Sequence, residues 1–302
     1  MAGAIRRHNA RSSGVRAEGS GATRLVVLVA SIVGLGGYLY PFLLPLGEGV
    51  GGDAAAHADD APLLFAAVTG FCLLAILTAI ADDHGGVARS KTVALLGVLV
   101  ALDAMLRLVP SVLGASPIFL LIILVGAVFG ATFGFQMGAL TVLLSAFITG
   151  GVGPWLPYQM LGAGWIGLTA GWLPRGGSPR RRLAVLAIFG ALWGFLFGAL
   201  LNLWFWPFAA PGAGAATDLY WAPGLSLAET VARYARFYLT TSLAFDLFRA
   251  IGNAALVLTL GGPALRVLER YRARFTWQPW VETAASGDAA MSERAAPPLP
   301  VQ

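Results

Sequence analysis

Four ionisable residues stand inside long apolar stretches of this chain, and their spacing arranges them in two pairs. Asp103 and Arg107 are four residues apart, and Asp246 and Arg249 are three apart, so each pair shares one face of a helix. A charged side chain at membrane depth is costly, so such residues usually pair or mark a functional site. We predict intramembrane ion pairs that clamp helices together, with a ligand contact or a proton relay as the functional alternatives.

The depth of these residues predicts how the pairs meet. The two predicted helices that carry these residues run in opposite directions. The depth of each residue in the membrane follows from its distance to the cytoplasmic end of its helix, at a rise of about 1.5 Å per residue. On that scale Asp103 lies level with Arg249, and Arg107 with Asp246. We therefore predict two crossed ion bridges between the helices.

A second group of residues suits the binding of a flat, partly apolar solute. Aromatic rings near a membrane surface are typical of the interfacial belt, and isolated amides commonly bond a neighbouring helix. Aromatic residues on outer loops that must meet also suit the walls of a ligand site. The predicted substrate-binding residues are Trp155, Tyr158, Gln159, Asn202, Trp204, Tyr220 and Trp221.

The first of these residues belong to a turn at positions 150–157, GGVGPWLP. Its glycines and prolines interrupt the helical hydrogen-bond ladder, so we expect no regular helix there. The following run to Trp172 is apolar except for Gln159. It carries small residues at Ala163, Gly167 and Gly171, a spacing that gives one smooth helix face for close packing. The turn is therefore expected at the outer membrane surface, at the start of a tightly packed helix.

The composition sets the class of protein that must position these residues. Hydrophobic residues make up 57% of the 302 residues and charged residues only 12%, about half the charged fraction of a soluble protein. Runs of about 20 apolar residues recur along the chain, each long enough to span a bilayer. These features predict an all-α polytopic membrane protein. In such a protein a net charge of +5 reports topology and does not indicate nucleic-acid binding.

The apolar runs predict about eight transmembrane helices with both termini in the cytoplasm. The run 117–149 would reach about 50 Å as one helix, against a hydrocarbon core of about 30 Å, so we divide it near Thr132–Gly134. This division also places the arginines of 174–182 inside. The expected spans are 24–46, 62–80, 92–109, two within 117–149, 158–173, 183–207 and 237–260, with a short interfacial helix at 226–236 and disordered cytoplasmic tails at 1–23 and 281–302.

Small residues recur at four-residue spacing in several of these spans. They include Gly126 to Gly138, Gly190 to Gly198, and the pair Gly97 and Ala101. Lipid supplies no hydrophobic drive for helix association, so close van der Waals packing must supply it. We expect packing within the chain, with a docking face for a partner membrane protein as the alternative.

The sequence lacks the usual signatures of several enzyme classes. It contains no GxxxxGK[ST] and no GxSxG, its single cysteine is Cys72, and its three histidines lie outside the predicted spans. A P-loop ATPase, a buried His/Cys metal site and a rhomboid-like protease are therefore not expected. We expect no enzyme activity, no catalytic residue, no cofactor and no metal.

Two segments of the chain resemble the substrate-binding S components of energy-coupling-factor (ECF) vitamin transporters. One runs from Phe129 to Met160 and ends in the Gly-Pro-Trp…Pro…Gln-Met turn, and the other is 242–253, SLAFDLFRAIGN. Both look most like the cobalamin-type branch. The resemblance covers residues 91–265 and implies a six-helix S-component core, preceded by two additional transmembrane helices in 24–80.

The resemblance also implies the partners and the location. An S component binds a vitamin from outside and then docks on a transmembrane coupling subunit driven by two ATPase subunits. Small residues at four-residue spacing on its first core helix meet that coupling subunit, and here Gly97 and Ala101 match that spacing, with Ala94 and Ala104 close by. The implied protein is a multi-pass subunit of the bacterial plasma membrane that takes up cobalamin or another corrinoid.

Two alternatives stay open at this point. The same machinery can carry another substrate, such as riboflavin or a modified-base precursor. A membrane enzyme or assembly factor, by contrast, would use the Asp103/Arg107 and Asp246/Arg249 pairs as a reactive centre.

Overall fold

The structure is a computed structural model that describes residues 21–43, parts of 62–77, 86–111, 115–208, 217–222 and 225–275. Every regular element in these ranges is a helix, which confirms the all-α prediction. The α-helices are α1 (Gly21–Leu43), α3 (Gly86–Leu106), α4 (Ile118–Phe129), α5 (Ala131–Thr149), α6 (Leu156–Ala170), α7 (Pro179–Phe205), α8 (Leu227–Thr241) and α9 (Leu243–Phe275). Short 3-10 turns lie at Trp206–Phe208 and Thr217–Leu219, and the described residues of 62–77 are also helical.

Within the described ranges, four stretches are long and apolar enough to cross a membrane. They are Gly21–Leu39, Ala131–Thr149, Pro179–Phe205 and Leu243–Ala273, and Ile118–Phe129 is a shorter apolar helix. The chain is therefore a polytopic membrane protein. The full set of eight spans stays a prediction, and the predicted tail 281–302 and outer loop 47–61 lie outside the described residues.

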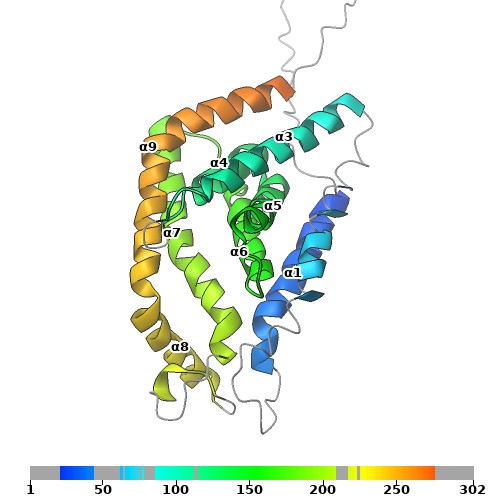
Figure 1. The fold of residues 1–302 in the computed structure, drawn as a ribbon. Coiled ribbons are helices and arrows are strands. Elements are labelled where there is room, and N and C mark those ends of the chain that lie inside the picture. Colours follow the sequence, from blue (N-terminus) through cyan, green and yellow to red (C-terminus); the bar gives the residue numbers. More distant parts are fainter. Residues whose placement is uncertain are drawn as a thin grey trace, which may run out of the picture.

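The helices surround a central hairpin of α5 and α6, with α1 on one side and α7 and α9 on the other (Figure 1). α4 packs on this hairpin and buries 11 of its 12 residues, which explains why it is apolar on all faces. One end of the molecule, where α9 finishes and α1, α3 and α7 begin, lies at the top of Figure 1. We call it the arginine-rich end, because Arg24, Arg175, Arg180, Arg181, Arg182, Arg266, Arg270 and Arg272 belong to it. We call the opposite end, where α6 begins and α7 finishes, the aromatic end.

The long apolar run divides at Gly130, two residues before the predicted break. Gly130 has φ 107°, a left-handed conformation that only glycine adopts without strain, and α4 stops there as α5 begins. The sequence indicated that a break was needed but not which of several small residues would supply it.

Glycine seams hold the central helices together. A Cβ atom built on Gly134 would lie 2.2 Å from the carbonyl oxygen of Gly167, and one built on Gly138 would lie 2.1 Å from that of Ala163. The backbones of α5 and α6 therefore touch, which only a missing side chain permits. The expectation that small residues pack within the chain is therefore confirmed for Gly134 and Gly138. Gly97 differs from them, because no atom lies within 4 Å of its Cβ position.

The segment before the last helix differs from the prediction. Ser226 caps α8 with a reciprocal hydrogen-bond pair to Glu229, and these hydrogen bonds lower the pKa of Glu229. α8 then continues to Thr241, so the last long helix begins at Leu243 and not at Phe237. It runs to Phe275 through Pro263, and its final part, orange in Figure 1, turns aside over the arginine-rich end.

Candidate functional site

An aromatic cluster lies at the aromatic end and contains two of the predicted substrate-binding residues in direct contact. Tyr158, in the first turn of α6, stacks on Trp204, near the end of α7, with ring centroids 5.6 Å apart and an interplanar angle of 22°. Tyr158 is almost fully buried. Pro157 precedes it in the first helical turn, where the missing amide hydrogen costs nothing.

Helix α1 completes this cluster, a role that was not predicted from the sequence. The Tyr38 hydroxyl donates to the carbonyl oxygen of Tyr158 at 2.8 Å, and the two rings meet edge to face at 5.0 Å. Phe42, one turn further along, contacts Trp206 and Trp221 at 6.0 and 5.9 Å. The run of aromatic residues near the end of the first span was the available signal. The family resemblance begins at residue 91 and so implies no role for this run.

The two predicted amides have different environments. Asn202 donates to the Ser242 hydroxyl at 2.7 Å, which joins α7 to the start of α9. Gln159 has a buried side-chain carbonyl oxygen, Oε1, to which no described residue donates a hydrogen bond. A buried acceptor without a donor is costly and uncommon in folded proteins, so this oxygen is a candidate ligand contact.

The other predicted aromatic residues lie around the cluster. Trp155 folds back over its own turn, with its ring against Gly153 and its Nε1 donating to the Gly151 carbonyl at 3.2 Å. It remains 40% exposed. Tyr220 packs on Phe237 of α8 at 5.9 Å, and Trp221 joins the cluster through Phe42. Part of the predicted outer connection, 209–216 and 223–224, lies outside the described residues.

The crossed ion bridges predicted between Asp103 and Arg249, and between Arg107 and Asp246, are not formed. Arg249 instead pairs with Asp246 on its own helix and donates to the Gly194 carbonyl of α7 at 3.1 Å. Asp103 is fully buried and lies near Thr141 of α5, with no hydrogen-bond partner for either oxygen among the described residues. The prediction failed because α3 packs mainly on α5 and α9 mainly on α7. Equal depth in a membrane does not make two helices neighbours, and the four residues form no common centre.

The predicted coupling residues divide between two faces of α3. Ala94, Gly97 and Ala101 are exposed, whereas Ala104 is completely buried inside the chain. Beside Gly97 an entirely apolar groove of about 350 Å³ runs between α3 and α5, with Leu96, Val100 and Phe147 among its walls.

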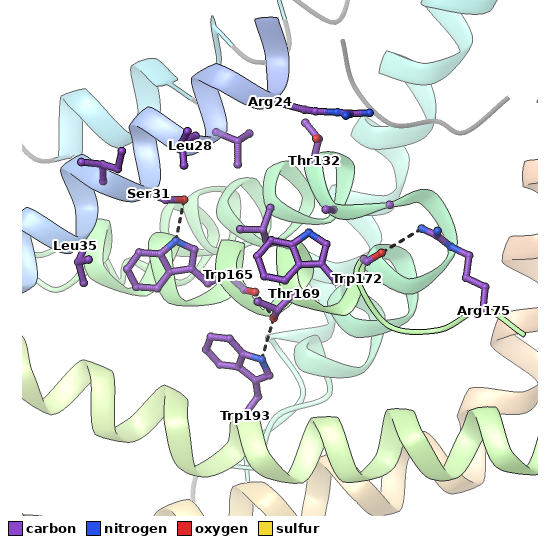
Figure 2. Close-up of a pocket in the computed structure, with 16 residues that line it drawn as sticks. Arg24, Leu28, Ser31, Leu35, Thr132, Trp165, Thr169, Trp172, Arg175 and Trp193 are labelled. Atoms are coloured by element: carbon purple, nitrogen blue, oxygen red, sulfur yellow. Dashed lines mark hydrogen bonds between the residues drawn. The ribbon is translucent and has the colours of Figure 1, made fainter. Parts of the chain in front are cut away.

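A larger cavity, of about 720 Å³, lies away from the predicted substrate-binding residues, none of which lines it. It is bounded by α1, the start of α5, the second half of α6 and the middle of α7, and it reaches the arginine-rich end (Figure 2). Trp165 donates from Nε1 to the Ser31 hydroxyl at 3.1 Å, and Trp193 donates to the Thr169 hydroxyl at 3.0 Å. The polar atoms of both indoles are therefore satisfied within the protein, which leaves apolar ring surface for the cavity wall.

Comparison with known proteins gives one match. A family model described as ECF transporter, substrate-specific component, matches residues 91–261, more than half of the chain. No curated protein and no solved structure matches the sequence or the fold.

Proposed function

Because the chain belongs to the family of ECF transporter substrate-specific components, it is a substrate-binding membrane subunit of an ECF-type importer, and we propose that its substrate is cobalamin or a related corrinoid. The binding site is the aromatic end, with the Tyr158–Trp204 stack at its centre. We assign Trp155, Tyr220 and Trp221 to the rim of this site and Gln159 and Asn202 to its polar contacts.

The observation that carries this assignment is the buried Oε1 of Gln159, the residue that follows Tyr158 in the chain, which has no donor among the described residues. A corrinoid combines a broad, flat ring with several side-chain amides. Its ring suits aromatic walls, and its amide N–H groups are the donors that a buried carbonyl oxygen lacks. Tyr38 and Phe42 contact the same cluster, so α1 contributes to the site or must shift for the ligand to enter.

Substitution of Gln159 tests the site. Gln159→Leu keeps the size of the side chain but removes the acceptor, and we expect the affinity of the purified protein for cobalamin to fall about tenfold. The matched control is Gln136→Leu, because Gln136 is also a buried amide with an unsatisfied atom but lies on α5 outside the aromatic cluster. Equal affinity in the wild type and Gln159→Leu, with saturable binding in both, would contradict the site but not the function.

Capture must be followed by transfer to other subunits, since S components work with a coupling subunit and ATPases. We propose that the coupling subunit docks on the exposed face of α3 formed by Ala94, Gly97 and Ala101. The open space beside Gly97 and the apolar groove next to it support this face, because small residues allow close helix approach. The buried Ala104 is not part of it.

A further inference from the structure

We propose that α1 is a gate, a helix that covers the substrate site and separates from α6 when the substrate enters. The inference rests on the proposed function, since it takes the Tyr158–Trp204 stack at the aromatic end as the centre of the site. The gate lies outside the family match at 91–261, so this chain adds it to the family core.

α1 and α6 meet along a regular antiparallel seam, in which contacts recur about once per helical turn. At one end of the seam, Trp165 donates from Nε1 to the Ser31 hydroxyl at 3.1 Å (Figure 2). One turn further along α1, the Cβ position of Gly34 lies 2.5 Å from a methyl carbon of Leu161. The positions rise along α1 while they fall along α6, so the seam leads directly to the first turn of α6 and the substrate site.

The seam ends in a clasp of two tyrosines over the substrate site. The Tyr38 hydroxyl donates to the Tyr158 carbonyl oxygen at 2.8 Å, and the Tyr158 hydroxyl donates to the Gly37 carbonyl oxygen at 3.3 Å. The two rings meet edge to face, while Trp204 stacks on the same Tyr158 ring. Tyr158 is only 2% exposed as a result. A flat ligand therefore reaches this ring only after a covering side chain has moved away.

The helix seams of the core are tighter than the seam of α1. The backbones of α5 and α6 touch at Gly134 and Gly138, and on α7 the Cβ position of Gly194 lies 2.5 Å from the Cα atom of Ala250 in α9. The atoms nearest to the Cβ position of Gly34, by contrast, all belong to one flexible leucine side chain. The α1 seam also depends on hydrogen bonds, which are individually weak between membrane helices. Separation therefore occurs most readily at α1.

The rest of α1 is only loosely attached to the core. Leu28, Ile32 and Leu35 line the cavity of about 720 Å³ and are each half or more exposed. Val27 and Ala30, which are buried, are apolar as well. Lipid tails are as apolar as these side chains, so lipid replaces their protein contacts at little cost when α1 moves away.

A reversible disulfide between α1 and α6 tests the gate. The Cγ atom of Leu161 lies 3.1 Å from the Cβ position of Gly34, which places two cysteines there within reach of a disulfide, whose Cβ atoms are about 3.5–4.5 Å apart. Gly34→Cys and Leu161→Cys are combined in a Cys72→Ala background, which removes the native thiol. We expect oxidation to lower the association rate constant of cobalamin by about tenfold or more, and reduction to restore it. Stopped-flow quenching of tryptophan fluorescence measures this rate.

The matched control is a disulfide between two helices that stay together. Gly190→Cys and Asn253→Cys join α7 to α9 in the same background, and the Asn253 Cβ atom lies 3.4 Å from the Cβ position of Gly190. Oxidation of this pair should leave the association rate constant unchanged. The gate is overturned, and the proposed function kept, if oxidation leaves the α1–α6 pair equally fast, if the α7–α9 pair loses as much, or if the α1–α6 pair forms no disulfide. Reduced proteins that bind neither cobalamin nor another vitamin would contradict the proposed function, and the gate with it.

Loosening the clasp should have the opposite effect. Tyr38→Phe keeps the ring but removes the hydrogen bond to Tyr158, so the open state becomes more populated. Because binding scales with the population of the competent state, we expect the association rate constant to rise about threefold. Tyr238→Phe is the matched control, because the Tyr238 hydroxyl donates to the Phe195 carbonyl at 3.5 Å and joins α8 to α7. If Tyr38 only supports the site, Tyr38→Phe will lower the affinity without faster association, and that result overturns the gate.

Discussion

Gly198 shows how much a single residue decides in this fold. It lies on α7 directly against the carboxylate of Asp246, which pairs with Arg249 on α9. Gly190, two turns earlier on the same helix, accepts a hydrogen bond from Asn253 at 3.0 Å but leaves more room, since the nearest atoms to its Cβ position are 3.3 Å away. Gly190 and Gly198, two glycines of one ladder, therefore differ in how much space there is for an added side chain.

Alanine at these two positions should give different results. Gly198→Ala places a methyl group 2.1 Å from the Asp246 oxygens, so we expect it to lower the free energy of unfolding by about 1–3 kcal/mol. Gly190→Ala places its methyl group 3.3 Å from the end of the Ile123 side chain, a tight contact that a small shift of this side chain relieves. Alanine also favours helix over glycine by about 1 kcal/mol, so this variant should remain near the wild type. Unfolding of both proteins in detergent micelles, followed by heat or denaturant, measures the difference. Equal stability of the two variants would show that the α7–α9 seam is looser than described.

At the scale of elements, most helices could be predicted from apolar runs, but their neighbours could not. The charge pattern required a break within 117–149, and the structure has it at Gly130. The boundary between α8 and α9 was misplaced because the sequence continues without a break from an amphipathic to an apolar helix. The crossed ion bridges failed for a different reason: depth follows from sequence position, whereas lateral packing depends on side-chain fit between particular helices.

The exposed face of α3 gives a test at this scale. Gly97→Leu fills the open space beside Gly97, and we expect at least a tenfold loss of the coupling subunit in co-purification, with cobalamin affinity unchanged. Gly36→Leu is the matched control, because Gly36 of α1 also has no neighbour within 4 Å of its Cβ position. Equal co-purification of the two variants would place the coupling contact elsewhere.

In the whole molecule, the family core and the N-terminal helix are parts of one packed unit. α1 contacts the aromatic cluster through Tyr38 and forms one wall of the 720 Å³ cavity, although it lies outside the matched region 91–261. The sequence could nominate Tyr158 and Trp204 as candidate site residues from their predicted place near the outer membrane surface. It could not identify Tyr38, because nothing in a sequence says that an added helix will pack against a particular tyrosine.

The measurement that tests the central claim most directly is equilibrium binding of cobalamin to the purified chain, with riboflavin and other vitamins as comparisons. We expect saturable binding of one cobalamin per chain, and no saturable binding of riboflavin at the same concentrations. Saturable binding of a different vitamin would keep the function and replace the substrate. A protein that is folded and monodisperse but binds no vitamin of the panel would contradict the account.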